Sequence, residues 1–214
     1  LITSNSNLGF GKAANRGIVQ AKGEYIVVMN SDVIIPEPQN ITVMLEYLER
    51  NPDVGLVGPK LLNFDNSHQP SAFRYYTPLS IVLRRTPLGK TSWGKEKIDK
   101  FMMRDYENLT ETPTEVDWLM GSIMATKKSY IEKIGLFDER FFMYMEDVDL
   151  CRRYWENDLK VIYYPLAAVY HFHGRASRTK NIFFALLNKY TRTHLMSAIK
   201  YFKKHGLKTP RYGK

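Results

Sequence analysis

Cysteine, long apolar stretches and internal repeats are what this sequence lacks. Cys151 is the single cysteine, which rules out an internal disulfide and a cysteine-rich metal site and fits a reducing compartment. We interpret it as a buried small hydrophobic residue rather than a reactive thiol. No apolar run approaches the roughly 18 residues that a membrane-spanning helix requires. With 214 residues, 44% of them apolar and 25% charged, the chain has the composition of a soluble globular protein large enough for one full domain.

Acidic residues are missing from the C-terminal part of the chain. Residues 176–214 contain ten Lys or Arg and no Asp or Glu, whereas residues 1–175 contain the other 21 basic residues and all 22 acidic ones. The net charge of +9 therefore belongs to the tail. Such a tail indicates a partner with an anionic surface, which can be a membrane, a nucleic acid or another polyanion.

The tail also carries the pattern of a basic amphipathic helix. Over residues 181–205, apolar side chains recur on one face, and lysines and arginines occupy the rest. Such a helix can lie on a membrane surface. It can also dock its apolar face on the domain and leave its lysines in solvent, and we favour this second interpretation.

Helical and strand-like segments alternate along the body of the chain. Continuous apolar runs rich in β-branched residues are typical of buried strands, and segments with helical periodicity separate them. The predicted strands cover 24–29, 54–62, 116–126 and 159–164, and the predicted helices cover about 12–22, 41–50, 129–134 and 146–157. Pro165 is expected to end the last strand. This order predicts an α/β fold with a mostly parallel mixed sheet flanked by helices.

The segment from residue 63 to 115 departs from this alternation. Its periodicity fades, and it is rich in polar, proline and aromatic residues. Irregular stretches of this length inside a domain are usually functional loops or disordered segments, and the aromatic residues argue against full disorder. We therefore expect a loop with short helices that covers a cleft.

Polar residues directly follow the first predicted strand. Asn30, Ser31 and Asp32 stand at its carboxyl end, which is the edge where ligands bind in open α/β sheets. The Asp32 carboxylate can hold a divalent cation through oxygen. Asn, Ser and Asp also form ordinary turns at strand ends, and the residues by themselves favour neither interpretation.

A glycine-broken polar loop over residues 5–11 leads into the first predicted helix. The free N–H groups at a helix N-terminus can bind an anion, and Lys12 and Arg16 lie one turn apart beside it. The spacing matches neither a Walker loop nor the dinucleotide-binding fingerprint. An ordinary junction between a loop and a helix is at least as good an interpretation.

Three carboxylates stand within residues 146–149, directly after an aromatic and apolar run. Carboxylates in the first turn interact favourably with the helix dipole and free N–H groups, so we expect a helix to begin at or near Glu146. A carboxylate held there beneath an apolar wall is suited to general-base catalysis. First-turn acids are also common without any catalytic role, and this plain interpretation is favoured for Glu146 and Asp147 taken alone. Asp149 is expected to position the helix or to form hydrogen bonds.

Several separate motifs follow one another along residues 1–175. In chain order they are Asn5-x-Asn7-x-Gly9-Phe10-Gly11-x-Ala13-x-Asn15-x-Gly17, Met29-Asn30-Ser31-Asp32-Val33, Trp118-x-x-Gly121, Gly135-x-Phe137-Asp138-Glu139-x-Phe141-Phe142-x-Tyr144-x-Glu146-Asp147-x-Asp149-Leu150 and His171-x-His173-Gly174. Taken together, these motifs resemble the family 2 glycosyltransferases of the GT-A fold, in particular the rhamnosyltransferase-like branch. The resemblance implies a Rossmann-like GT-A domain. It also implies inverting transfer of a sugar from a nucleotide-diphosphate donor, such as dTDP-rhamnose or a UDP-sugar. The acceptor would be a glycan or a lipid-linked glycan in cell-surface polysaccharide synthesis.

The same resemblance implies roles for individual residues. Asp32 matches the metal-binding Asp of the family's DxD-type motif, and His171 matches a histidine that can complete the metal site. Asp147 matches the catalytic base, with Glu146 beside it. Residues expected near the donor are Asn7, Gly9, Asn15, Asn30 and Ser31, and those expected to line the acceptor and donor pocket are Trp118 and Gly121. For His173 a structural role is favoured.

The chemistry of sugar transfer agrees with these residue types. The departing diphosphate needs its charge neutralised, which Mn²⁺ or Mg²⁺ held by Asp32 and His171 would do, with imidazole slightly favouring Mn²⁺. The acceptor hydroxyl needs a base on the opposite face of the sugar, and Asp147 is the expected base. One direct displacement gives inversion without a covalent intermediate.

The sequence differs from the family pattern in two ways. Asn30 replaces an Asp at the first position of the DxD-type motif. Family members also begin with two further βα units that hold the nucleotide, so we expect a partial GT-A domain over 1–175, incomplete at the N-terminus, and a basic helical extension over 176–214. The alternative is a non-catalytic fragment or binding module whose basic tail contacts a membrane or polyanion. A nucleic-acid partner rests on charge alone and is not expected. The expected location is the cytoplasm, with peripheral contact at the inner membrane face as an option.

Overall fold

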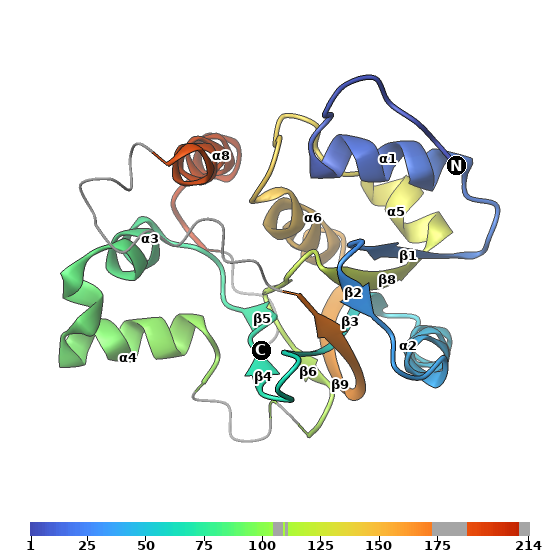
Figure 1. The fold of residues 1–214 in the computed structure, drawn as a ribbon, viewed down its shortest axis with the longest axis horizontal. Helices are drawn as coiled ribbons and strands as arrows, with labels where there is room; N and C mark the ends of the chain where they lie inside the picture. Colours follow the sequence, from blue (N-terminus) through green and yellow to red (C-terminus); the bar gives the residue numbers. More distant parts are fainter. Residues whose placement is uncertain (105–108, 110, 173–187, 210–214) are drawn as a thin grey trace.

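The computed structural model describes residues 1–104, 109, 111–172 and 188–209, and it shows a mixed α/β fold (Figure 1). The main sheet has seven strands, and its central path runs in the order β1, β8, β3, β9, β2. These strands are β1 Tyr25–Met29, β2 Val33–Ile34, β3 Val54–Leu62, β8 Ile123–Lys127 and β9 Lys160–His171. The short strands β4 His68–Gln69 and β6 Thr114–Glu115 pair with β3 and β9 respectively. A separate two-stranded sheet joins β5 Ala72–Phe73 to β7 Trp118–Leu119.

The strand directions correct the prediction of a mostly parallel sheet. Only the pair β3–β9 is parallel among the described strands, and the remaining pairs are antiparallel. The reason is β8, which lies between β1 and β3 and runs antiparallel to both. It enters the sheet from the irregular segment that precedes it rather than through the helical crossover that a parallel strand requires. The alternation of elements predicted the strands, while this long-range insertion decides which of them are neighbours.

The strand β9 also continues beyond its predicted end. Pairing with β3 joins Pro59 to Tyr164 and then Lys60 to Ala168, so residues 165–167 have no partner in the register. Proline in a sheet is tolerated at bulges because no ladder hydrogen bond is needed there. Pro165 therefore lies at a bulge rather than at the end of the strand, and the chain continues in register to His171.

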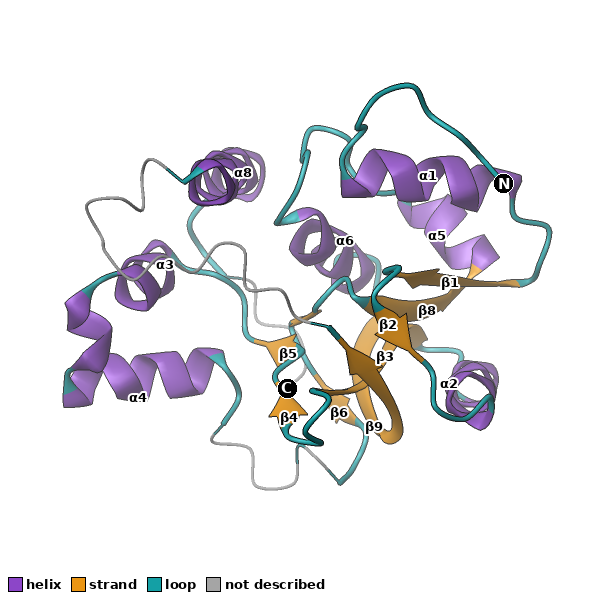
Figure 2. Ribbon diagram, viewed as in Figure 1, coloured by secondary structure: helices purple, strands orange, loops and turns teal. Residues whose placement is uncertain are grey.

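Helices cover both faces of the main sheet (Figure 2). The described helices are α1 Phe10–Gln20, α2 Gln39–Arg50, α3 Pro78–Arg85, the 3-10 helix η1 Pro87–Lys90, α4 Ser92–Phe101, α5 Lys128–Ile134, α6 Glu146–Trp155 and α8 Lys189–His205. Helix α2 buries Met44 and Leu48 against one face, together with residues of β3 and β9. Helices α1, α5 and α6 belong to the larger core on the other face. The short helices predicted within residues 63–115 are confirmed as α3, η1 and α4.

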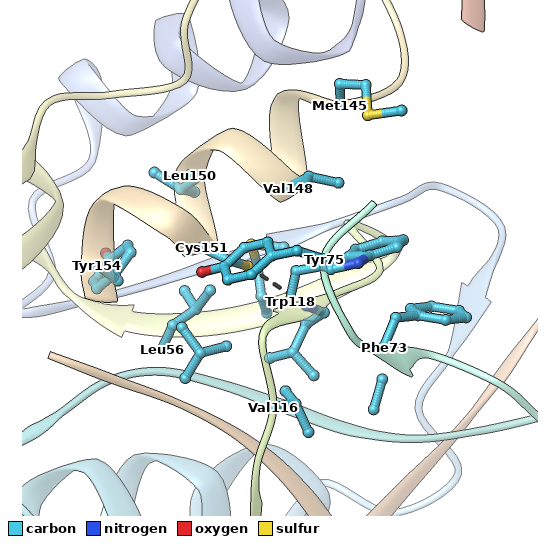
Figure 3. Close-up of a cluster of buried hydrophobic side chains, with 14 of the residues drawn as sticks. Leu56, Phe73, Tyr75, Val116, Trp118, Met145, Val148, Leu150, Cys151 and Tyr154 are labelled. Atoms are coloured by element: carbon cyan, nitrogen blue, oxygen red, sulfur yellow. Dashed lines mark hydrogen bonds between the residues drawn. The ribbon is translucent and has the colours of Figure 1, made fainter. Parts of the chain in front are cut away.

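The larger core surrounds α6 (Figure 3). Cys151 is fully buried, and its sulfur accepts the Leu119 N–H at 3.5 Å. Burial raises the pKa of its thiol, so the prediction of an inert hydrophobic residue is confirmed. Tyr154 is also fully buried and shares a hydrogen bond of 2.7 Å with the Thr126 hydroxyl. We call residues 146–149, the first turn of α6, the acidic turn. The apolar residues that follow it anchor α6 to the core.

The described part of the C-terminal helix docks on the domain, as favoured from the sequence; residues 181–187 of the predicted helix lie outside the described ranges. Ser197 donates to the Met143 carbonyl at 2.8 Å, and Lys200 donates to the Arg140 carbonyl at 2.7 Å. His205 and Lys204 both contact Asp149 in α6. None of the helices in the described ranges has the length and apolarity that a bilayer crossing requires. The division at residue 175 stays a prediction.

Candidate active site

The acidic turn begins at a constrained stretch of backbone. Tyr144 and Met145 precede α6 with φ values of 68° and 70°, a left-handed conformation that non-glycine residues rarely adopt. Strain of this kind persists only where the surroundings hold it, and it is concentrated at functional sites. Here the Met145 carbonyl accepts the Asp149 N–H at 2.9 Å, and the Tyr144 ring packs 5.2 Å from the ring of His194. The turn therefore presents Glu146 and Asp147 in a fixed arrangement at the start of α6, where the sequence predicted them.

The Asp147 carboxylate is held by backbone N–H groups on both oxygens. Oδ2 accepts the Gly121 N–H at 3.0 Å, and Oδ1 accepts the Val148 N–H at 2.9 Å. Burial raises the pKa of Asp147, and these two hydrogen bonds offset part of the rise. The residue remains partly exposed. A positioned, partly exposed carboxylate with a raised pKa has the properties of a general base.

Glu146 lies in a different environment from its neighbour. Its side chain is 6% exposed, and its Oε2 has no hydrogen-bond partner within the described ranges. Burial, together with the charge of Asp147, raises the pKa of Glu146 well above its usual range. The pair therefore favours a protonated Glu146 beside an ionised Asp147. In this state Asp147 can accept a proton and Glu146 cannot.

Asp32 and His171 meet at the end of β1 and β9, as the metal-site prediction requires. His171 Nε2 lies 3.4 Å from Asp32 Oδ1, and the Phe172 N–H donates to the Asp32 carbonyl at 3.0 Å. The imidazole is buried, whereas the Asp32 side chain is 44% exposed. Burial lowers the pKa of His171, and the Asp32 charge opposes that change. A neutral imidazole beside an exposed carboxylate is a donor set that suits a divalent cation.

Gln69 is a partner of this pair that sequence reasoning missed. Its Oε1 lies 2.8 Å from His171 Nδ1, and the side chain is buried. A hydrogen bond from Nδ1–H to Gln69 fixes the tautomer and leaves the Nε2 lone pair facing Asp32. Within the described ranges no cluster of three His, Cys, Asp or Glu side chains forms, so a cation here would take its further ligands from elsewhere. His173 lies outside those ranges.

Backbone contacts bring the two carboxylate centres to one edge of the sheet. The Asn30 N–H donates to the Ser122 carbonyl at 2.8 Å, next to the Gly121 that holds Asp147. Residues 30–32 also line a cavity of about 710 Å³, together with residues of α1 and β1. The turn at 120–122 therefore links the polar strand end to the acidic turn of α6.

Two of the five residues predicted near the donor, Asn7 and Gly9, lie in the loop before α1. Asn7 Oδ1 accepts the Gly9 N–H at 3.0 Å, and the Phe10 N–H donates to the Phe142 carbonyl at 3.1 Å. Gly9 has φ of 79°, and a Cβ there would lie 2.2 Å from the Phe142 oxygen. The loop thus packs against the segment that leads to the acids, and only glycine fits at this contact. Ser31 is exposed beside Asp32.

Two predicted residues are engaged in holding the fold. Asn15 is 6% exposed; its Nδ2 donates to the Phe137 carbonyl at 2.9 Å, and its Oδ1 accepts the Phe137 N–H at 2.9 Å. Trp118 is 5% exposed, stacks 4.4 Å from Phe73, and donates from Nε1 to the Arg74 carbonyl at 2.8 Å. Both side chains therefore hold the local fold, and the predicted donor role of Asn15 and pocket role of Trp118 stay predictions. Gly121, in contrast, touches the Asp147 carboxylate directly.

Comparisons with known proteins agree with these motifs. The model of glycosyltransferase-like family 2 matches residues 1–194. The N-acetylglucosaminyl-diphospho-decaprenol L-rhamnosyltransferase of Mycobacterium tuberculosis is 34% identical over 188 residues, which cover 83% of this chain and 60% of that protein. The rhamnosyltransferase WbbL of Escherichia coli is 26% identical over 202 residues, which cover 90% of this chain and 69% of that protein. The chain therefore spans about 60% of the length of its mycobacterial relative.

Solved structures show the fold. GalNAc-T7, whose crystal structure contains UDP, GalNAc and Mn²⁺, matches with a TM-score of 0.57 at 15% identity, over 97% of this chain and 43% of that one. The mannosyltransferase PcManGT of Pyrobaculum calidifontis, in complex with GDP-Man and Mn²⁺, matches with a TM-score of 0.54 at 16% identity, over 98% and 48%. These neighbours confirm the predicted GT-A fold. Because the family model matches nearly the whole chain, the chain belongs to glycosyltransferase-like family 2.

Proposed function

We propose that this chain carries the acceptor and metal side of an inverting glycosyltransferase that moves a sugar from a nucleotide-diphosphate donor to a glycan acceptor. The observation that carries the proposal is the shared sheet edge. It holds Asp147 by two backbone N–H groups and the pair of Asp32 and His171 at the neighbouring strand ends. One centre is suited to take a proton, and the other is suited to hold the cation that offsets a diphosphate charge.

The residues have separate tasks in the proposed reaction. Asp147 accepts the proton of the acceptor hydroxyl as that oxygen bonds to the anomeric carbon, and the bond from that carbon to the diphosphate oxygen breaks on the opposite face. A divalent cation bound by Asp32 and His171 would neutralise the departing diphosphate. Glu146, protonated and buried, keeps a second negative charge away from Asp147. A single displacement inverts the anomeric configuration.

The relatives narrow the proposed substrates. The mycobacterial relative is named for rhamnosyl transfer to an N-acetylglucosaminyl-diphospho-decaprenol, and WbbL is named a rhamnosyltransferase. We therefore propose dTDP-rhamnose or a UDP-sugar as donor, Mn²⁺ or Mg²⁺ as cofactor, and a lipid-linked glycan as acceptor in polysaccharide synthesis. We also propose peripheral membrane contact through residues 176–214, because a lipid-linked acceptor lies in a membrane and these residues carry the excess positive charge of the chain.

A product assay tests the proposal. The protein encoded by the complete reading frame is incubated with Mn²⁺, dTDP-rhamnose or UDP-sugars, and an N-acetylglucosaminyl-diphospho-lipid. We expect transfer with an anomeric configuration opposite to that of the donor, read by nuclear magnetic resonance, and loss of transfer in excess EDTA. Retention of configuration, or full turnover in EDTA, contradicts the mechanism. Binding of donor and acceptor without any product favours the non-catalytic alternative.

A further inference from the structure

Two adjacent arginines, Arg84 and Arg85, stand at the end of α3. Arg84 donates to the Tyr76 hydroxyl at 2.9 Å, and its guanidinium carbon lies 5.0 Å from the centroid of the Phe101 ring. Arg85 is partly buried, and both burial and the charge of Arg84 lower the pKa of its guanidinium. Neither forms an ion pair with a carboxylate of the described residues. By contrast, Arg153 is 2.9 Å from the buried Asp149 carboxylate.

A histidine of α8 completes this group from the opposite side. The ring of His194 lies 5.8 Å from that of Tyr76 and 5.2 Å from that of Tyr144. Its Nδ1 is buried, and no described residue satisfies it. Burial and the charges of Arg85 and Arg84 lower the pKa of His194 to about 3, so the ring is neutral. We call Tyr76, Arg84, Arg85, Tyr144 and His194 the arginine cluster.

The arginine cluster combines two adjacent guanidinium groups, which form no ion pair within the described ranges, with the buried His194 Nδ1, which no described residue satisfies. Arg85 is partly buried beside the exposed Arg84, and partial burial of one cation next to another is unfavourable, because hydration is lost and the two charges repel each other. A bound anion removes both penalties, and guanidinium groups suit phosphate because they donate in a planar fork. The composition of the cluster therefore indicates a phosphate-containing ligand.

The position of the arginine cluster relates it to the acceptor side. Burial raises the pKa of Tyr76, and the charge of Asp147 raises it further, so the cluster and the proposed base lie within electrostatic reach of each other. Figure 1 shows α3 and α8 on one side of α6 and the β1 and β2 strands on the other. The Asp32 and His171 pair, which we assign to the donor diphosphate, thus belongs to the opposite side of the acidic turn.

An apolar rim lies next to the arginine cluster. Four large apolar side chains of α3, η1 and α4 are between 43% and 56% exposed: Leu79, Val82, Leu88 and Trp93. Leu79, Val82 and Arg85 follow at spacings of three on α3, which places them along one helix face. Apolar surface beside a phosphate-binding group matches a ligand whose charged head is joined to a hydrocarbon chain.

We propose that the arginine cluster binds the diphosphate of a polyisoprenyl-linked acceptor and that the apolar rim contacts the first isoprenoid units. The inference rests on the proposed function, since it names the part of that acceptor which Arg84, Arg85 and His194 hold. The same chemistry is present in the donor diphosphate, so the experiment separates the two sources.

Calorimetric titration of the 214-residue chain tests the proposal with farnesyl diphosphate in EDTA as the acceptor probe. The double variant Arg84→Gln/Arg85→Gln is expected to bind at least tenfold more weakly. Arg50→Gln, at an exposed arginine of α2 that pairs with Glu46, is the matched control and is expected to bind as the wild type does. A parallel titration with dTDP and Mn²⁺ reports the donor side, and the double variant is expected to leave it unchanged.

A further variant tests the apolar rim separately from the arginines. Val82→Asp changes an exposed residue, so it is expected to fold normally, to weaken farnesyl diphosphate binding and to leave binding of inorganic pyrophosphate unchanged. Equal farnesyl diphosphate affinity in all variants, or no binding by the wild type, overturns the proposal. Loss of dTDP binding in the arginine variant with farnesyl diphosphate unaffected assigns the cluster to the donor and also overturns it. Failure of dTDP to bind the wild type, with the expected farnesyl diphosphate pattern intact, counts against the proposed donor site alone.

Discussion

Replacing Asp149 by asparagine should separate the C-terminal helix from the acidic turn. The Asp149 side chain is fully buried and faces two cationic side chains and the imidazole of His205. Arg153 Nε is 2.9 Å from Oδ2, His205 Nε2 is 2.7 Å from Oδ1, and Lys204 also contacts Oδ1. Burial opposes ionisation, but the hydrogen bond from His205 and the charges of Arg153 and Lys204 leave the pKa of Asp149 below its usual value. This carboxylate is the common partner of α6 and α8.

The loss of folding stability expected for Asp149→Asn follows from the burial of the carboxylate. Removing one partner of a buried ion pair costs about 3–5 kcal/mol, because the remaining charges stay buried without compensation. For a domain of this size each kcal/mol lowers Tm by about 2–4 °C, so Asp149→Asn should lower Tm by roughly 6–20 °C. Asp53→Asn is the matched control, since Asp53 pairs with Lys160 at the surface with its side chain 57% exposed. Exposed pairs contribute below about 1 kcal/mol.

Urea denaturation followed by circular dichroism measures both variants, and hydrogen exchange locates the effect. We expect faster exchange in α8 of the Asp149→Asn protein while β3 and β8 remain protected. The pH dependence has a definite sign: a lowered pKa contributes stability above about pH 3.9, the usual value for Asp, and that stability is lost as the pH falls. Equal destabilisation by Asp149→Asn and Asp53→Asn would contradict the role of Asp149 as the buried partner that α6 and α8 share.

Three further predictions test other contacts. Gln69→Leu should weaken Mn²⁺ binding by about 10- to 100-fold by freeing the His171 tautomer, and an unchanged Kd in calorimetry would argue against the metal pair. Gly9→Ala should destabilise by about 1–3 kcal/mol because of its positive φ and the close backbone oxygen. Gly17→Ala, with open space around it in α1, should stabilise by about 0.5–1 kcal/mol. Urea denaturation of Gly9→Ala and Gly17→Ala should therefore give changes of opposite sign in the free energy of unfolding. Glu146→Gln should raise Tm more at pH 8 than at pH 5, because the raised pKa makes ionisation of the buried carboxyl unfavourable for the fold only above about pH 4.3; an equal change at both pH values would contradict this.

The candidate site residues that could be predicted from the sequence are those next to a recognisable strand or helix in the chain. Asp32 follows an apolar strand, and Glu146 and Asp147 begin a helix after an apolar run, so each is recognisable within about ten residues. His171 was placed by its motif after a strand, although the bulge at Pro165 was not foreseen. Their meeting at one edge agrees with the rule that ligands bind at the carboxyl ends of strands.

The residues that sequence reasoning missed depend on contacts far apart in the chain. Gln69 lies 102 residues from the His171 that it orients. Arg85 comes from the irregular segment, where periodicity gives no face. The amphipathic pattern of the tail predicts a helix face, but it does not predict that His194 packs against Tyr76 and Tyr144. The signal available was the density of aromatic and basic residues between 73 and 85, which indicated a functional loop without naming its partners. The antiparallel insertion of β8 escaped prediction for the same reason, because strand order is a long-range property.

The most direct test of the central claim compares Asp147→Asn with the wild type in two measurements on the protein encoded by the complete reading frame. We expect the variant to bind dTDP or UDP with Mn²⁺ as tightly as the wild type, since Asp32 and His171 are untouched. We also expect sugar transfer to fall by at least about 100-fold, the lower end of a general base's contribution. Transfer at the wild-type rate by Asp147→Asn, with donor binding intact, would contradict the assignment of Asp147 as the base.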